Sequence, residues 1–179
     1  MSGAGTRLLP MALASIVVTG CATSSPPPKL TADPCTDLKE VVADYPNRFE
    51  NLRGSRSDYT TMTLYRAKKD IVKGHCEIWE WADGETAYVC SLNAPSEPVA
   101  HQRYDQVNQF VASCLGQAWQ PETSDRVRDG GIAGVVTRYR NTGHRDFVIS
   151  VHNVSIPGAP RVPRTNYVYI GSSGRSDAM

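Results

Sequence analysis

Apolar side chains recur at helical spacing in two stretches of the chain. The first stretch begins after Asp33, a typical helix cap, and Pro34, which suits the first helical position, and it continues to Pro46. The second follows Ser96 and extends to about residue 118. The two apolar faces consist of Leu38, Val41, Val42 and Tyr45, and of Tyr104, Val107, Val111, Cys114, Leu115 and Ala118. We predict two amphipathic helices that each pack one face against a core.

Between these helices the pattern changes to alternation, which predicts strands. Residues 58–66 are rich in Thr and Tyr and alternate in polarity. Residues 75–90 predict a hairpin around a three-residue loop, Ala82-Asp83-Gly84, with Gly84 in the left-handed conformation. The loop places Trp81 opposite Glu85, Ile78 opposite Tyr88 and Cys76 opposite Cys90.

The last third of the chain also predicts strands. Residues 132–140 and 145–154 form a second expected hairpin around a loop at 141–143, and a closing strand follows at 166–170. We expect the loop to place Arg138 opposite Asp146 and Val135 opposite Ile149. Val127 is assigned to an edge strand before this hairpin, and the tail at 171–179 is expected to be flexible.

These elements predict a single α+β domain over residues 34–170. It has two layers, in which two helices pack on an antiparallel sheet in the order α-βββ-α-βββ. This length suffices for one hydrophobic core. The order resembles the two-layer fold of secretion chaperones in topology only, and a fold does not fix a function.

The N-terminus has the layout of a secretory signal. Arg7 precedes an apolar segment, Leu8 to Val18, that is too short to span a bilayer as a helix. The segment ends in Val18-Thr19-Gly20-Cys21, which resembles the lipobox of bacterial lipoproteins. The alternative is that Cys21 is an ordinary core thiol in a buried helix, but that does not explain the small residues before it.

The lipobox resemblance implies an address and an anchor. Signal peptidase II would remove residues 1–20 and leave Cys21 as the lipid-bearing first residue. Ala22 after the cysteine implies sorting to the periplasmic face of the outer membrane. Residues 21–33 are then a Pro-rich tether between the lipid and the domain.

Four cysteines remain after Cys21, and an even number in an oxidising compartment indicates two disulfides. Zinc binding is the alternative, but no pair has CxxC or CxxH spacing. The first hairpin pairs Cys76 with Cys90, which leaves Cys35 and Cys114 as the second pair. That second bond would tie the first helix to the second.

Charge and motifs argue against several functions. The chain has 19 basic and 18 acidic side chains, so removal of Arg7 with the signal leaves 18 of each. Balanced charge argues against nucleic-acid binding. No hydrolase motif is present, and Gly130-Gly131 leads into a strand, so it makes a poor phosphate loop. We therefore expect no cofactor, no metal and no catalytic residues.

Histidines and acidic residues support an alternative hypothesis, in which the protein is an enzyme. We expect His75, His101, His144 and His152 to be surface or cap residues, with His144 and His152 on one polar face of the second hairpin. Glu77, Glu80 and Glu85 share the first hairpin and could act as paired carboxylates. This alternative is a small envelope hydrolase that uses acidic or His residues.

Trp79 and Trp81 project from one face of the first hairpin. They are either core residues under the helices or an exposed apolar patch that binds a protein, peptide, glycan or lipid. The sequence therefore favours a non-catalytic binding or structural module for an envelope partner. An inhibitor of a periplasmic hydrolase, or an immunity factor against one, is an example of this class.

Overall fold

The structure is a computed structural model that describes residues 33–128, 130–155 and 164–178. The expected signal segment and lipid-bearing Cys21 lie outside the described residues, as does the expected tether apart from Asp33. Within the described part, no helix is long and apolar enough to cross a membrane.

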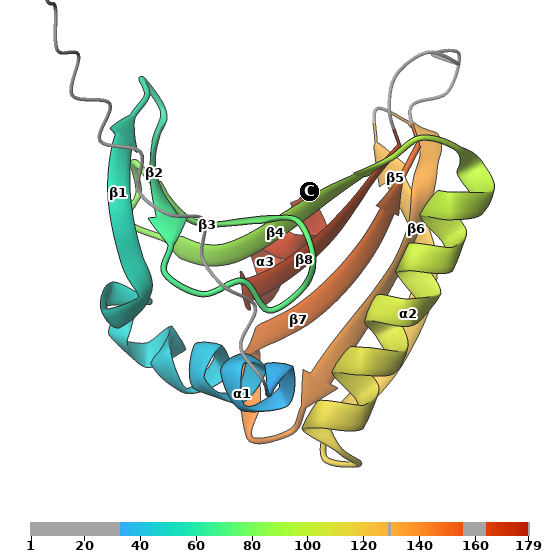
Figure 1. Cartoon of the computed structure of the whole chain (residues 1–179), viewed down its shortest axis with the longest axis horizontal. Helices are drawn as coiled ribbons and strands as arrows, with labels where there is room; N and C mark the ends of the chain where they lie inside the picture. The colour runs from blue at the N-terminus through green and yellow to red at the C-terminus, as the bar shows by residue number, and fades with distance from the viewer. Residues whose placement is uncertain (1–32, 129, 156–163, 179) are drawn as a thin grey trace, which may run out of the picture.

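The described residues form an α+β fold around one antiparallel sheet of eight strands (Figure 1). Helix α1 (Pro34–Asp44) leads through two 3-10 turns (Tyr45–Asn47 and Glu50–Leu52) to β1 (Arg53–Asp58), β2 (Met62–Ala67), β3 (His75–Trp81) and β4 (Thr86–Ala94). Helix α2 (Glu97–Leu115) leads to β5 (Gln120–Arg128), β6 (Gly131–Asn141), β7 (His144–Val154) and β8 (Arg164–Ser172), and α3 (Ser173–Ala178) follows. Each half of the molecule is thus a helix followed by four strands.

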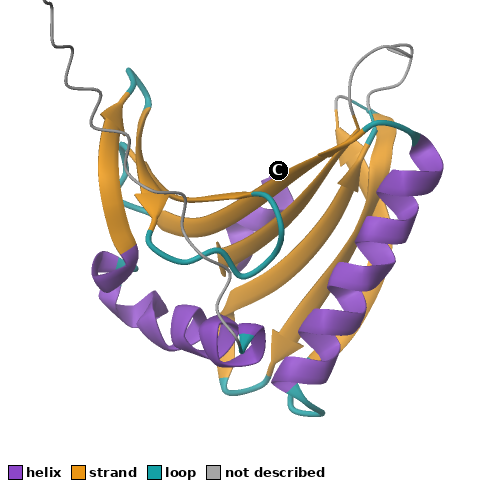
Figure 2. Cartoon of the chain, in the orientation of Figure 1, coloured by secondary structure: helices purple, strands orange, loops and turns teal. Residues whose placement is uncertain are grey.

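The two halves join at the centre of the sheet. The strand order is β1-β2-β3-β4-β8-β7-β6-β5, so the last strand of each half pairs with the other. Strands β1 and β5 form the two edges. The sheet is strongly curved, with β1 and β2 rising on one flank and β5 and β6 on the other (Figures 1 and 2).

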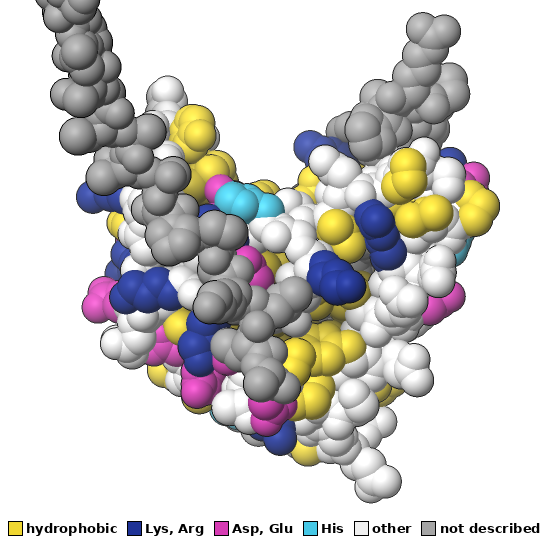
Figure 3. All heavy atoms as spheres, in the orientation of Figure 1, with side chains coloured by type: hydrophobic (Ala, Val, Ile, Leu, Met, Phe, Trp, Pro, Cys, Tyr) yellow, Lys and Arg dark blue, Asp and Glu magenta, His cyan; other side chains and the backbone are white. Residues whose placement is uncertain are grey.

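Helices α1 and α2 form where the sequence predicts them. The Asp33 carboxylate caps α1 by accepting hydrogen bonds from the backbone N–H of Cys35 (3.1 Å) and Thr36 (3.2 Å). Helix α2 begins directly after Ser96 and ends just before Gly116, whose φ of 71° only glycine adopts readily. In Figure 3 apolar side chains are visible between the two helices, and charged side chains gather on the flank of α1, β1 and β2.

The main core lies between α1, α2 and one side of the sheet, which we call the helix face. Two rows of buried side chains cross this face from strand to strand: Cys76, Cys90, Val168 and Val151, and beside them Ile78, Tyr88, Ile170, Ile149 and Tyr139. Each fully buried Ile or Val contributes roughly 1.5–3 kcal/mol. The rows continue across β4 and β8, so both halves share one core.

Both predicted disulfides are confirmed. Cys76 and Cys90 face each other across β3 and β4, with Cα atoms 4.0 Å apart. Cys35 and Cys114 join the start of α1 to the end of α2, with Cα atoms 5.0 Å apart. The predicted register of the first hairpin is also confirmed, and Gly84 has a φ of 83°.

The expected strand order was wrong, because each half has four strands and not three. The single strand expected at 58–66 is the junction of β1 and β2. Strand β1 escaped prediction because its sequence, RGSRSD, contains no apolar residue. Of β5, only the part at Val127 was expected as a strand, because Val127 is the single large apolar residue of β5. Both are edge strands, and an edge strand with little buried surface needs no apolar alternation.

The expected flexible tail was also wrong. Strand β8 continues through the buried Gly171 to Ser172, and α3 follows directly. Helix α3 packs on β7 and β8 from the side opposite α1 and α2, since Ser176 contacts Ser150, whose side chain lies on the other face from its neighbours Ile149 and Val151. The described part of the chain therefore has a third helix, which covers part of the sheet face that the expected two-layer arrangement left open.

The predicted register of the second hairpin was wrong by four residues. Arg138 pairs with Ser150 and Val135 with Asn153, because an irregularity between Tyr139 and Asn141 inserts extra residues of β7. A shift by an even number leaves each side chain on its expected face. Phe147, Ile149 and Val151 therefore still share the helix face with Tyr139.

Candidate functional site

The two tryptophans expected to bind a partner lie on the sheet side opposite α1 and α2, which we call the tryptophan face. Trp79 and Trp81 are half-buried and meet edge to face, with ring centroids 6.0 Å apart. They flank a second, smaller apolar cluster of Ala87, Val89, Val148 and Tyr169. They are thus neither core residues under the helices nor fully exposed.

Helix α3 holds one edge of this face in place. The Arg175 guanidinium lies 4.5 Å from the ring centroid of Trp81 and also pairs with Glu85 (2.6 Å) and Asp83. On the other side of the helix, Asp177 pairs with Arg138 (2.8 Å). A cation over an indole ring stabilises by about 0.5–1 kcal/mol at exposed sites. The C-terminal helix thus limits how much of Trp81 is free.

A polar pocket opens beside Trp81, and we call it the hairpin pocket. It has a volume of about 380 Å³ and lies where the β1–β2 turn meets the end of β3. Its lining includes Tyr59, which is 61% exposed, and Trp81. The remaining lining residues are Arg56, Thr60, Thr61, Met62, Thr63, Tyr65, Glu80 and Ala82. Aromatic rings and hydroxyl groups together suit a ligand with both polar and apolar surface.

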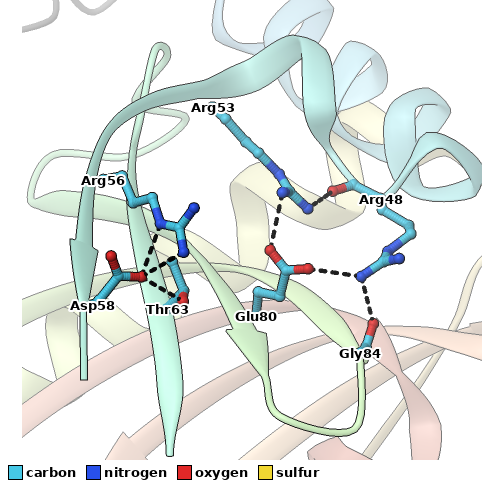
Figure 4. A network of polar contacts seen from close by, with 7 residues as sticks. All are labelled: Arg48, Arg53, Arg56, Asp58, Thr63, Glu80 and Gly84. Carbon is cyan, nitrogen blue, oxygen red and sulfur yellow. Dashed lines mark hydrogen bonds and ion pairs between the residues drawn. The ribbon is translucent and has the colours of Figure 1, made fainter. Parts of the chain in front are cut away.

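Glu80 and Arg56 form one wall of the hairpin pocket, and further charged side chains hold them from behind (Figure 4). The two oxygens of the Glu80 carboxylate accept hydrogen bonds from Arg48 (2.8 Å) and Arg53 (2.9 Å). Arg48 also donates to the carbonyl of Gly84, which fixes the β3–β4 loop against the turn after α1. Two guanidinium groups hold Glu80 in one orientation, so this wall is rigid.

The outer part of this wall is a separate ion pair. Asp58 accepts hydrogen bonds from Arg56 (2.8 Å) and from the Thr63 hydroxyl (2.9 Å). The hydrogen bond from Arg56, followed by that from Thr63, lowers the pKa of the Asp58 carboxyl. The same bond raises the pKa of Arg56. Both groups are exposed, so the pair contributes little to stability.

A second, more apolar cleft lies on the helix face, between the ends of α1 and α2 and the start of β7. We call it the aromatic cleft, and its volume is also about 380 Å³. Trp119 and His144 are stacked at 13° with centroids 6.2 Å apart, and Phe147 meets both rings edge-on. The disulfide between Cys35 and Cys114 braces its walls. Sequence reasoning missed this cleft, although Trp119, four residues after the end of α2, was a signal.

The histidines do not lie together. His144 is exposed on the helix side, beside Trp119. His152 is 1% exposed on the tryptophan face, where its Nε2 lies 2.8 Å from the Ser150 hydroxyl. The expectation that all four are surface or cap residues was therefore wrong for His152. The prediction failed because β7 alternates between apolar and polar residues, and the polar face that carries His152 was expected to be exposed.

The environment of His152 keeps its ring neutral. Burial, together with the nearby charges of Arg126 and Arg138, lowers the pKa of His152 to about 3. Its hydroxyl partner Ser150 in turn contacts Ser176 of α3 at 2.8 Å. This chain of three polar side chains joins α3 to the sheet without an acidic member.

The acids of the first hairpin do not converge either. Glu80 lies on the helix face, whereas Glu77 bonds to His75 and Trp79 on the tryptophan face. Glu85 forms an ion pair with Arg175. Each carboxylate has its own partner, so the paired carboxylates of the enzyme hypothesis are not assembled. Among the described residues, no group of three His, Cys, Asp or Glu side chains could hold a metal ion.

Comparison with known proteins found no matching family, no matching curated protein and no matching solved structure.

Proposed function

We propose that this chain is a lipoprotein, anchored through Cys21 at the periplasmic face of the outer membrane, whose domain binds an envelope partner without catalysis. The observation that carries the binding role is the position of Trp81. This side chain belongs both to the half-exposed tryptophan pair and to the lining of the hairpin pocket. Half-exposed tryptophans beside a rigid pocket are typical of binding surfaces.

The rigidity of the site supports recognition. The Cys76–Cys90 bond ties β3, which carries both tryptophans, to β4, and two arginines hold Glu80 in place. A surface that is ordered before binding loses little conformational entropy when a partner arrives. The expected partner is a protein, peptide or glycan of the envelope, and inhibition of a periplasmic hydrolase or immunity against one fits this role.

The anchor is tested by the variant Cys21→Ala. We expect the full chain to be found in the outer-membrane fraction with a lipid mass on its N-terminal peptide, and the variant to lose both properties. Lipid on two or more chains gives durable attachment, so the loss should be nearly complete. An unmodified Cys21 in membrane-bound protein would contradict the anchor.

The binding surface is tested by photo-crosslinking in intact cells. A crosslinking residue at Thr61, which is exposed and lines the hairpin pocket, should capture one partner. The same residue at Ala112, which is exposed on α2, should not capture it. Capture at Thr61 should fall at least fivefold in Trp81→Ala and in the milder variant Tyr59→Ser. Equal capture at both positions, or turnover of an envelope substrate by the pure protein, would overturn the proposal.

A further inference from the structure

Arg126 is a buried cation that has no partner among the residues that the structure describes. The residue is 7% exposed, and its Nε–H is enclosed and meets no hydrogen-bond acceptor of that described part. No acidic side chain of the described residues forms an ion pair with it, although other arginines on this part of the sheet are paired. Arginine is almost never buried without a partner, because a buried charge loses its hydration.

The backbone explains how Arg126 comes to be buried. It is the residue at which the β5–β6 pairing changes register, between the pairs Asp125–Val135 and Val127–Ile132. Such an irregularity turns one side chain away from the regular alternation of the strand. Strand β5 is otherwise exposed at nearly every position, so the burial of this one residue is specific.

Among the described residues, no acidic side chain pairs with Arg126, and the titratable groups that interact with it are Arg128, Tyr167 and His152. The strand register brings the two groups Arg126 and His152 to one region, because Val136 of β6 pairs both with Ser124, two residues before Arg126, and with His152. Burial, followed by the like charge of Arg128, lowers the pKa of Arg126, and the charge of Arg126 disfavours the protonated imidazole of His152. The Nδ1 atom of His152 is buried and finds no hydrogen-bond partner within the described ranges of the chain. Asp177, the acid that α3 brings to this face, pairs with Arg138 and Arg140.

The Nε–H of Arg126 and the Nδ1 of His152 are the two groups that an anion could satisfy. A neutral His with a free ring nitrogen and an Arg with free N–H groups both gain a hydrogen bond from an oxyanion. The planar guanidinium matches two oxygens of a carboxylate or phosphate group at once. Burial strengthens such a contact, because water no longer screens it.

We propose that Arg126 and His152 form a binding site for a small oxyanion, that is, a carboxylate or phosphate group, at the β5–β6 side of the tryptophan face. The bound oxyanion is the counter-ion of Arg126. This site is separate from the hairpin pocket and does not depend on the proposed function.

The test uses the purified full chain with sodium phosphate and sodium acetate, against sodium chloride at equal ionic strength. We expect one or both oxyanions to raise the Tm in a saturable manner, by roughly 3 °C at ten times the dissociation constant. The ring resonances of His152, assigned by their loss in His152→Asn, should shift with the same midpoint. A stronger response to phosphate identifies a phosphoryl ligand, and a stronger response to acetate identifies a carboxylate.

Matched variants separate the site from general salt effects. In Arg126→Gln the saturable rise should disappear, whereas Arg145→Gln, which changes an exposed arginine of β7, should keep it. Arg126→Lys retains the charge without the fork and should bind at least tenfold more weakly. If Arg126→Gln does not fold, the shift of the His152 resonances with added oxyanion in the unchanged protein still decides whether the site binds. Absence of a saturable response to either oxyanion, or an unchanged response in Arg126→Gln, would falsify the site.

Discussion

The two halves of the molecule share one backbone plan but stabilise it differently. Each is a helix followed by four antiparallel strands, and both helices lie on the same face. In the first half β3 has seven residues and is bonded to β4 by Cys76–Cys90. In the second half β7 has eleven residues, and Val151 and Val168 face each other in the same row. We infer that the disulfide compensates for the shorter ladder.

The opposite face differs more strongly between the halves. The first half presents Trp79 and Trp81 there, whereas the second half presents Ser150 and His152 under α3. The helix face must form one common core, so both halves supply apolar residues to it. On the other face the two halves share only the small cluster of Ala87, Val89, Val148 and Tyr169, and beyond it each half carries different side chains. The proposed partner surface therefore falls on the first half and the proposed oxyanion site on the second.

The largest expected effect comes from the bond between the halves. Removing it in Cys35→Ala/Cys114→Ala should lower the free energy of unfolding by about 4.5 kcal/mol, because the bond closes a loop of 79 residues. Removing Cys76–Cys90, which closes 14 residues, should lower it by about 3 kcal/mol. Urea unfolding of the purified variants measures both. A larger loss for the short loop would show that the hairpin bond does more than restrict the unfolded chain.

The next prediction compares equivalent core positions. Ile78 on β3 and Ile149 on β7 lie in one row of the helix face, and both are fully buried. Truncation to Ala should lower the free energy of unfolding by about 3 kcal/mol at either position, since both leave a similar cavity. Urea unfolding is the measurement, with the exposed Val127→Ala as control. A loss at Ile78 less than half of that at Ile149 would mean that the halves do not pack alike.

Acid should weaken the second half through His152. The pKa of His152 is lowered from 6.5 to about 3, so between these values the unfolded chain binds a proton that the folded chain does not. Stability therefore falls as the pH drops below 6.5, by about 2 kcal/mol at pH 5. Unfolding of His152→Gln should lack this contribution to the pH dependence, while the exposed His75→Gln should keep it. Identical pH profiles in all three proteins would contradict a buried neutral imidazole.

Sequence patterns predicted the parts of the fold that face the core. Helix α2, the β3–β4 hairpin and the Cys76–Cys90 pair follow from apolar spacing and turn residues, because burial imposes that spacing. The Cys35–Cys114 pair then follows by elimination. The edge strands β1 and β5 were not predictable as whole strands, since backbone pairing holds them and few of their side chains are buried. Local patterns also carry no signal for the irregularity near Arg140 that moved the second hairpin register.

The candidate sites were predictable only where one hairpin contains them. Trp79 and Trp81 could be placed on one face because they are two residues apart on a strand. The contact that covers Trp81 comes from Arg175 of α3, which lies far away in the sequence, and α3 lacks an apolar pattern. The burial of Arg126 likewise depends on a register change that involves β6. Contacts between distant segments decide such features, and no local pattern encodes them.

The smallest expected effect concerns the edge that α3 places over the tryptophan face. Arg175→Ala removes the cation over Trp81 and the pairs with Asp83 and Glu85, which should lower the free energy of unfolding by about 1 kcal/mol. The Trp81 ring should then become more accessible to acrylamide, measured as the difference in fluorescence quenching between otherwise identical proteins with Trp81 and with Trp81→Phe. Arg145→Ala, with no ring contact, should leave that difference unchanged. Unaltered quenching in Arg175→Ala would show that the aromatic surface is set by the sheet alone and that α3 does not control access to it.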